Sequence, residues 1–199
     1  MSCLNDLLIS KVRVKVLELF FKNPEEIYYV REITRLVKEE INAVRRELER
    51  MLECGLLKSE QRANRLYYYL NKNYLYYQEL QRIVAKSTGL GKKIRRYRRK
   101  LGTLSFVVFS GTFIAHQTPR PDELDIIFVG DVVLPELEQL IKAEQVELGR
   151  EINYAVLSAD EFEFRKTRRD PFVMEFLYAV RAMIIGEENE FVQRNLPTN

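Results

Sequence analysis

The sequence has few of the residues that build metal and redox sites. It contains one histidine, His116, and two cysteines, Cys3 and Cys54, in 199 residues. The cysteines lie far apart with no histidine near either, which excludes the spacing of a zinc site and a framework of disulfides. We interpret Cys54 as a small buried apolar residue. His116 stands on a polar loop, where a lone histidine is more typical of an ordinary surface position than of a ligand for metal or phosphate.

Long apolar runs are also missing. No run approaches the roughly 20 residues that cross a bilayer, and the N-terminus lacks the basic, apolar and small-residue order of a signal peptide. Apolar residues still make up 46% of the chain, and this favours a folded protein with one large or two small domains. We therefore expect a cytoplasmic protein without a membrane partner.

Charge is distributed unevenly along the chain. The first 100 residues contain 23 Lys and Arg against 12 Asp and Glu, whereas the remaining residues contain 9 against 17. The two parts therefore carry about +11 and −8. This asymmetry indicates two modules, 1–87 and 88–199, and makes a polyanion a candidate partner of the first.

The first module has the pattern of three helices followed by a hairpin. Apolar residues recur at helical spacing in 10–23, 28–37 and 41–55, and Gly55 is placed to cap the third helix. Two short strands, "LLKSEQ" and "LYYYLN", are joined by the basic turn "RANR". The outward face of the third helix presents four polar residues, Asn42, Arg45, Arg46 and Glu49.

This order resembles the winged helix-turn-helix domain of ArsR-like regulators, and "RRELERMLECGLL" with "NRLYYYLN" carries the resemblance. The resemblance implies that the third helix enters the major groove of double-stranded DNA. It implies DNA contacts by six residues: Asn42, Arg45 and Arg46 on the helix, and Arg62, Asn64 and Arg65 at the hairpin tip. An alternative is that Arg45 and Arg46 form a solvated face with pairs such as Arg45 and Glu49. The turn "VKEEIN" departs from the family, since many members have glycine there, and it brings Glu39 and Glu40 close to the expected DNA surface.

Two further helices are expected around the boundary. The segment 74–87 is rich in tyrosine, and it either pairs with its copy in a homodimer or packs on its own domain. The segment 88–102 holds seven Lys or Arg within 92–100. Ile94, Tyr97 and Leu101 recur at helical spacing, so we expect this helix to rest on the second domain. Its outward arginines either bind phosphate or form an ordinary solvated face.

The second module alternates between strands and helices. "LSFVVFSG", "LDIIFVG" and "EINYAVL" predict strands, "PELEQLIKAEQVEL" predicts a helix, and "DPFVMEFLYAVRAMIIG" predicts a closing amphipathic helix over 170–186. The overall prediction is an α+β protein whose second module is a small α/β domain with a mixed sheet.

This module resembles the minimal nucleotidyltransferase domain, whose signature is Gly-Ser, ten residues, then Asp-x-Asp. The sequence has Gly111-Thr112, ten residues, then Glu123-Leu124-Asp125. The tail is also similar to a group that joins a winged helix to this domain. The resemblance implies that Gly111 and Thr112 contact nucleotide phosphates and that Glu123 and Asp125 hold Mg²⁺.

Several positions depart from the active pattern. Thr112 replaces serine, Glu123 replaces the first aspartate, and Asn153 falls where a third acid is usual. "IAH" at 114–116 stands where active relatives commonly have an arginine. We therefore expect a DNA-binding transcriptional regulator with no assigned catalytic residue, whose second domain serves sensing, dimerisation or partner docking. The alternative is an Mg²⁺-dependent nucleotidyltransferase that modifies a protein or small molecule, and a third reading is a nucleotide sensor without chemistry.

Overall fold

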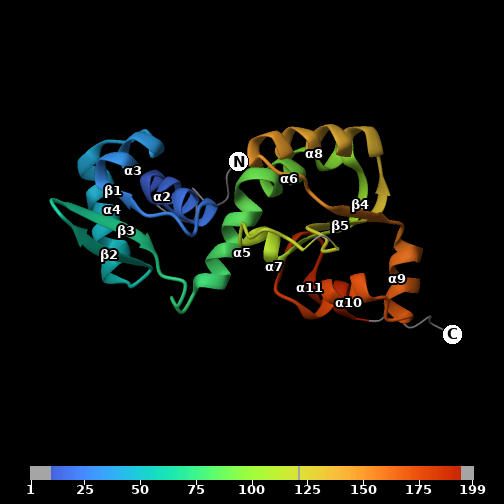
Figure 1. The fold of residues 1–199 in the computed structure, drawn as a ribbon. Helices are drawn as coiled ribbons and strands as arrows, with labels where there is room; N and C mark the ends of the chain where they lie inside the picture. The colour runs from blue at the N-terminus through green and yellow to red at the C-terminus, as the bar shows by residue number, and fades with distance from the viewer. Residues whose placement is uncertain (1–9, 121, 194–199) are drawn as a thin grey trace. The chain divides into compact units, whose positions relative to one another are not determined.

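The computed structural model describes residues 10–120 and 122–193, and it forms two compact units that divide between Ser87 and Thr88. Each unit combines helices with a sheet, so the protein is mixed α+β (Figure 1). Among the described residues, no helix has both the length and the apolar character needed to cross a membrane.

From residue 10 onward, the first unit contains four helices and a three-stranded antiparallel sheet of order β1-β3-β2. In chain order, its elements are α2 (Lys11–Lys22), β1 (Tyr28–Tyr29), α3 (Val30–Val37), α4 (Ile41–Glu53), β2 (Leu57–Arg62), β3 (Arg65–Leu70) and α5 (Tyr77–Ser87).

The ends of the helices in this unit are set by local capping. The Ser10 hydroxyl accepts a hydrogen bond from the backbone N–H of Arg13 and so caps the start of α2. Gly55, at φ +79°, follows the last turn of α4, and its N–H donates to Leu52 O at 2.9 Å. Gly55 therefore ends α4 as its position in the sequence predicted, because a positive φ is readily adopted by glycine.

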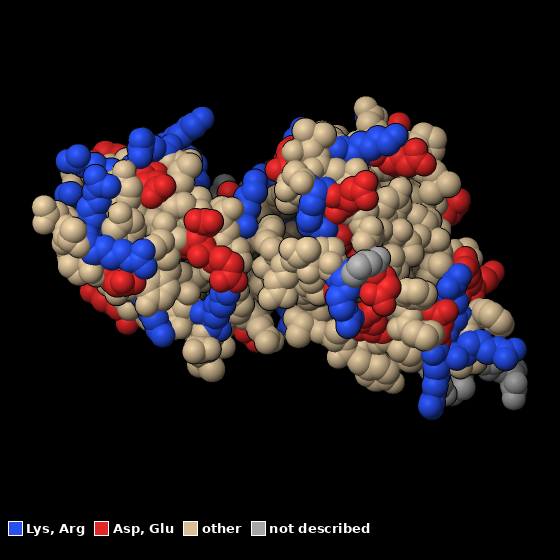
Figure 2. All heavy atoms as spheres, in the orientation of Figure 1, with Lys and Arg blue, Asp and Glu red and all other residues tan. Residues whose placement is uncertain are grey.

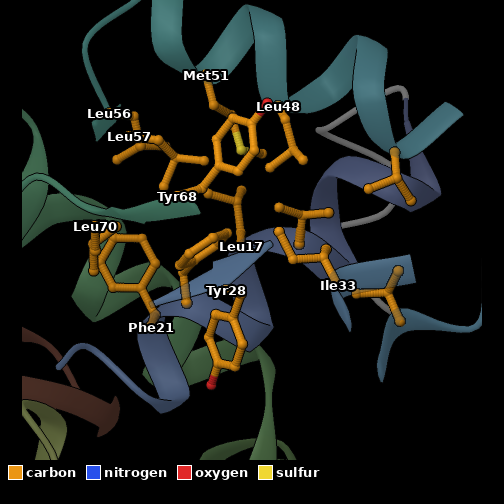
Figure 3. Packing of buried hydrophobic residues seen from close by; sticks show 14 of the residues in the cluster. Leu17, Phe21, Tyr28, Ile33, Leu48, Met51, Leu56, Leu57, Tyr68 and Leu70 are labelled. Carbon is orange, nitrogen blue, oxygen red and sulfur yellow. The ribbon is translucent and has the colours of Figure 1, made fainter. Parts of the chain in front are cut away.

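The core of the first unit lies between the helices and the inner face of the sheet. Figure 3 shows Leu17 and Phe21 from α2 packed with Leu48 from α4 and with Tyr68 from β3. Val44 and Leu48 are completely buried on α4, so burial of this face fixes which side of α4 is turned outward.

One charged group, the carboxylate of Glu47, is buried between α2 and α4. It accepts a hydrogen bond from Arg13 Nε at 2.8 Å and one from Arg50 Nη1 at 3.1 Å. Burial of Glu47 opposes its ionisation, but hydrogen bonds with the side chains of Arg13 and Ser10 outweigh burial and lower its pKa. The ion pair therefore fixes α4 against α2.

Cys54 is exposed and not buried, because α4 ends beside it and the chain turns away at Gly55. In α5, Val84 is buried and Leu80 and Tyr77 pack against the core of the first unit. This helix therefore packs at least partly on its own domain.

The second unit contains a four-stranded mixed sheet of order β6-β5-β4-β7, in which β5 and β6 are parallel and the other pairs antiparallel. In chain order, its elements are α6 (Gly89–Leu101), β4 (Gly102–Ser110), α7 (Gly111–Ile114), β5 (Ile126–Val132), α8 (Leu134–Leu148), β6 (Tyr154–Leu157), α9 (Ala159–Thr167), α10 (Pro171–Tyr178), β7 (Arg181–Ile185) and α11 (Glu188–Val192).

Helices cover both faces of this sheet. Figure 1 shows α6 and α8 on one side of the strands and α9, α10 and α11 on the other. Ile126, Ile127, Phe128 and Val129 of β5 are all nearly inaccessible to solvent. A continuous apolar run is expected for a strand that is buried on both faces, whereas a strand with one wet face alternates.

The predicted closing helix over 170–186 is wrong. The chain forms α10 over its first half, leaves the helix at Ala179, and then forms β7, which pairs antiparallel with β4. The apolar run at 182–185 fits a buried strand as well as a helix, and pairing satisfies the open edge of β4. The sequence analysis also did not predict α9.

We predict that Glu47→Gln lowers the free energy of unfolding by about 1 to 3 kcal/mol near neutral pH, because two arginines lose their shared charged acceptor. The folded-state pKa of Glu47 lies below its ordinary value of 4.5. Its contribution is therefore complete above that pH and is lost as the pH falls through the folded-state pKa. Denaturant titrations at several pH values should show the difference between wild type and variant shrinking in acid.

Glu49→Gln is the matched control, since Glu49 is an exposed carboxylate on the same helix. It should change stability by less than about 0.5 kcal/mol. Equal effects of the two substitutions, or a Glu47→Gln effect that does not depend on pH, would contradict the role given to the ion pair.

Candidate functional site

The turn that leads into α4 is fixed without glycine. Lys38 adopts the left-handed conformation at φ 55° and ψ 51°. The Lys15 ammonium donates to the Val37 carbonyl oxygen at 3.2 Å and pairs with the Glu39 carboxylate. A lysine therefore occupies the backbone conformation for which glycine is the usual choice, and an ion pair stabilises the turn around it.

Glu40 begins α4 as its N-cap. Its carboxylate accepts from the Ala43 N–H at 2.9 Å. Backbone hydrogen bonds with Asn42 and Ala43 lower the pKa of Glu40. Two of the glutamates near the expected DNA surface, Glu39 and Glu40, are therefore engaged in bonds within the unit, and Glu49 remains exposed.

The outward face of α4 is polar and basic. Asn42, Arg45 and Arg46 are exposed, whereas Val44 and Leu48 on the opposite side are fully buried. Within the described residues, neither arginine forms an ion pair, and the Arg45–Glu49 pair weighed from the sequence is absent. Both side chains are therefore open to solvent, and their charges add to the backbone hydrogen bonds that lower the pKa of Glu40.

The three predicted DNA-contacting residues at the hairpin tip differ in the partners that they have within the unit. Arg62 donates to both carboxylate oxygens of Glu60 at 3.1 Å, so its charge is balanced. Arg65 lies over the ring of Tyr29, with its guanidinium carbon 4.8 Å from the ring centroid. Asn64 is exposed in the two-residue turn. The tip therefore offers Asn64 and Arg65 to an anion more readily than Arg62.

Figure 2 shows Lys and Arg side chains projecting at several places from the first unit, at the left of the picture, with acidic side chains between them. The surface is thus mixed in charge. This makes the local arrangement on α4 and at the hairpin tip more informative than the total charge.

A second set of predicted residues meets in the second unit, around Asp125. Both Asp125 oxygens are held by the Arg150 guanidinium, with Nη1 to Oδ2 at 2.9 Å and Nη2 to Oδ1 at 3.0 Å. The Asn153 N–H also donates to Asp125 Oδ2 at 2.9 Å. Asp125 is inaccessible to solvent, so the arginine neutralises a carboxylate that water does not reach.

Glu123 is also bound within the unit. The Thr112 hydroxyl donates to one of its carboxylate oxygens, and the Arg120 N–H donates to the other at 3.1 Å. The Asn153 side-chain amide donates to the Glu123 carbonyl oxygen at 3.2 Å. The structure therefore brings Thr112, Glu123, Asp125 and Asn153 together, and their polar groups bind one another and their neighbours.

Gly111 has a packing role. A Cβ added there would lie 2.7 Å from the carbonyl oxygen of Val180, closer than ordinary contacts allow. The glycine therefore permits the start of α7 to approach the segment before β7. His116 follows α7 as an exposed residue at φ 53°.

These residues do not fit a Mg²⁺ ion as they are arranged. Mg²⁺ requires oxygen ligands at about 2.0 to 2.1 Å in octahedral geometry, but a guanidinium occupies both oxygens of Asp125. Within 10–120 and 122–193, no group of three or more His, Cys, Asp or Glu is placed to hold a metal. In this arrangement Arg150 neutralises the buried Asp125 carboxylate, and the hydrogen bond from Asn153 positions the start of β5 beside the segment before β6.

The sequence analysis missed Arg150, the residue whose guanidinium makes the Asp125 site unsuited to Mg²⁺. Arg150 lies in the loop after α8, where Gly149 ends the helix at φ 68°. It is separated from Asp125 by 25 positions, and no motif spacing connects the two. An arginine directly after a helix-capping glycine has no signal that distinguishes it from a solvated loop residue.

We predict that Arg150→Met lowers the free energy of unfolding by about 3 kcal/mol, because Asp125 would remain buried without its partner. Thermal unfolding of wild type and variant, each with and without Mg²⁺ and ATP, measures this.

Wild type should show no Mg²⁺-ATP-dependent rise in melting temperature, because a ligand stabilises only a state that binds it.

The control is Arg120→Met, since 72% of the Arg120 side chain is exposed and its loss should cost less than about 1 kcal/mol. A rise of several degrees in the wild-type melting temperature with Mg²⁺ and ATP would show that the site binds them after all.

Comparisons with known proteins give weak similarities. No protein-family model matches the chain, and no curated protein matches it. A solved structure of a possible transcriptional regulator from Methanosarcina mazei Go1 is similar at a TM-score of 0.33 and 15% identity, over 49% of this chain and 82% of that one. The crystal structure of human N-acetylserotonin methyltransferase in complex with SAM is similar at a TM-score of 0.31 and 12% identity, over 61% of this chain and 37% of that one.

Proposed function

We propose that this chain is a transcriptional regulator that binds double-stranded DNA through the winged helix-turn-helix of its first unit. In this proposal α4 is the recognition helix and the β2–β3 hairpin is the wing. Asn42, Arg45 and Arg46 contact bases and phosphates in the major groove. Asn64 and Arg65, and Arg62 to a smaller extent, contact the flanking backbone.

The observation that carries the proposal is the outward face of α4. Its two arginines are exposed and form no ion pair within the described residues, while the glutamates that begin the helix are engaged by Lys15 and by backbone N–H groups. A helix whose apolar face is buried and whose basic face is free suits a groove lined with phosphates.

We propose that the second unit is a nucleotidyltransferase-like domain without transferase activity, used for sensing, dimerisation or partner docking. The support is the Arg150–Asp125 pair. The Arg150 guanidinium neutralises the Asp125 carboxylate, which is the negative charge that a metal ion would need. The Mg²⁺-dependent transferase considered from the sequence gains no support from this geometry.

We further propose a homodimer formed through the region of α5. Leu75, Tyr76 and Ile83 are exposed by 78%, 55% and 41%, although Leu80 and Val84 beside them are turned toward the core of the unit. Two copies would also supply two recognition helices for two half-sites.

Arg45→Ala combined with Arg46→Ala should weaken binding to a mixed-sequence duplex by about tenfold or more at low salt, because two phosphate-facing charges are lost. The dependence of log affinity on log salt should become less steep by about 0.9 per lost phosphate contact. Fluorescence anisotropy of a labelled duplex over a salt series gives both quantities.

Lys11→Ala combined with Lys22→Ala removes the same charge from two exposed positions on α2, outside α4, the hairpin and the proposed dimer contact. This control should bind nearly as wild type does. If the α4 variant keeps wild-type affinity and salt slope, α4 is not the recognition helix.

Leu75→Glu combined with Ile83→Glu should convert the protein from two chains to one in sedimentation equilibrium, because charges would enter an apolar contact. Val146→Glu, at a residue that is 84% exposed on α8, should leave the mass unchanged. A wild-type protein that sediments as a single chain would refute the dimer.

A further inference from the structure

Helix α6 at the start of the second unit is buried along one face and basic along the other. Leu90, Ile94 and Leu101 are nearly inaccessible to solvent. The opposite face carries four exposed residues, which we call the α6 basic stripe: Lys92, Arg95, Arg96 and Arg99. Their spacing of i, i+3, i+4 and i+7 places them in one row along the helix.

Other basic residues of α6 have partners within the second unit. Lys93 pairs with Glu144 at 2.8 Å and with Glu147 at 2.6 Å. Arg98 Nη2 lies 3.5 Å from the Leu104 carbonyl oxygen. These two residues serve the packing of α6 on its own unit, so they are not part of the stripe.

The stripe differs from these two residues because its charges are not paired within the part of the chain that the structure describes. Among the described residues, Lys92, Arg95, Arg96 and Arg99 form no ion pair. The sequence has no Asp or Glu anywhere between Glu79 and Asp122. An ordinary solvated helix carries both signs at i, i+4 spacing, whereas here the neighbours at that spacing are like charges, which destabilise a helix.

The helix dipole accounts for only part of this arrangement. Cations are favourable in the last turn of a helix, where Arg98, Arg99 and Lys100 lie. Lys92 lies in the first turn of α6 and Arg95 at its middle, where the dipole does not favour positive charge. Their concentration on one row requires another explanation.

We propose that the α6 basic stripe binds the phosphate backbone of double-stranded DNA, as a second contact region in addition to the one on the first unit. The inference rests on the proposed function, and it adds contacts that are independent of sequence. Tyr97, with 39% of its surface exposed, carries Arg96 and Lys100 over its ring at 5.5 and 5.9 Å. The ring thus holds Arg96 of the stripe and one further basic group, Lys100, beside the row.

The connection along the chain favours a single duplex as the shared ligand. Only Thr88 separates the last residue of α5 from the first residue of α6. A phosphate-binding helix tethered this closely to a DNA-binding unit meets the same duplex at a high effective concentration. Weak contacts by the stripe therefore add to the total affinity.

The test is a triple variant, Lys92→Gln, Arg95→Gln and Arg99→Gln, in the full chain. Glutamine is a good helix former, so α6 should persist, and circular dichroism checks this. With a mixed-sequence duplex about three helical turns long, anisotropy from about 50 to 200 mM salt should show a log–log slope less steep by about 3. Affinity at the lowest salt should fall by about tenfold or more.

Two further variants make the comparison specific. Lys142→Gln, Arg168→Gln and Arg169→Gln remove the same charge from exposed positions elsewhere on the second unit and should leave the slope nearly unchanged. Lys92→Arg, Arg95→Lys and Arg99→Lys keep the charge of the stripe and should keep the wild-type slope.

The outcomes separate this inference from the function on which it rests. If wild type binds no duplex at any salt concentration, both fail. If the Arg45 and Arg46 variant loses affinity but the stripe variant keeps the wild-type slope, only the second contact region is refuted. The inference is also overturned if the stripe variant loses binding to polyglutamate but not to DNA, because the stripe would then recognise an acidic polypeptide.

Discussion

A carboxylate that is removed completely from water must be neutralised, and in the second unit this requirement falls on Asp125. Arg150 meets it with two hydrogen bonds, and the backbone of Asn153 adds a third. The Asp125 backbone carbonyl oxygen also accepts from the Ser110 N–H at 2.8 Å, and the Asp125 N–H donates to the Asn153 carbonyl oxygen. Through its side chain and backbone together, Asp125 thus joins the end of β4, the start of β5 and the approach to β6.

Much of the first unit could be predicted from its sequence, because its helices are amphipathic and end at recognisable residues. The helices α2, α3 and α4 and the hairpin occur where apolar spacing and Gly55 place them. The turn before α4 was harder to predict, since it depends on Lys15 reaching Glu39 across 24 positions. Such a bond is tertiary, so inspection of the turn alone does not reveal it.

The second unit was less predictable, for two physical reasons. A short apolar run such as 182–185 suits a strand and a helix equally, and the choice depended on the edge of β4 open to pairing. The state of the Asp125 site depends on Arg150, whose role follows from its position in space. Spacing alone brought Gly111, Thr112, Glu123 and Asp125 into consideration, but spacing carries no information about which cation faces Asp125.

The position of β7 in the sequence determines when the sheet of the second unit can form during synthesis. β7 pairs with β4, although the 70 residues of 111–180 separate the two strands along the chain. The sheet of the second unit therefore stays one strand short until residues 181–185 have left the ribosome. The elements described for the first unit are all encoded before residue 88. A nascent chain can thus carry a finished first unit while the edge of β4 is still exposed, and chaperones would have to protect that edge during this interval.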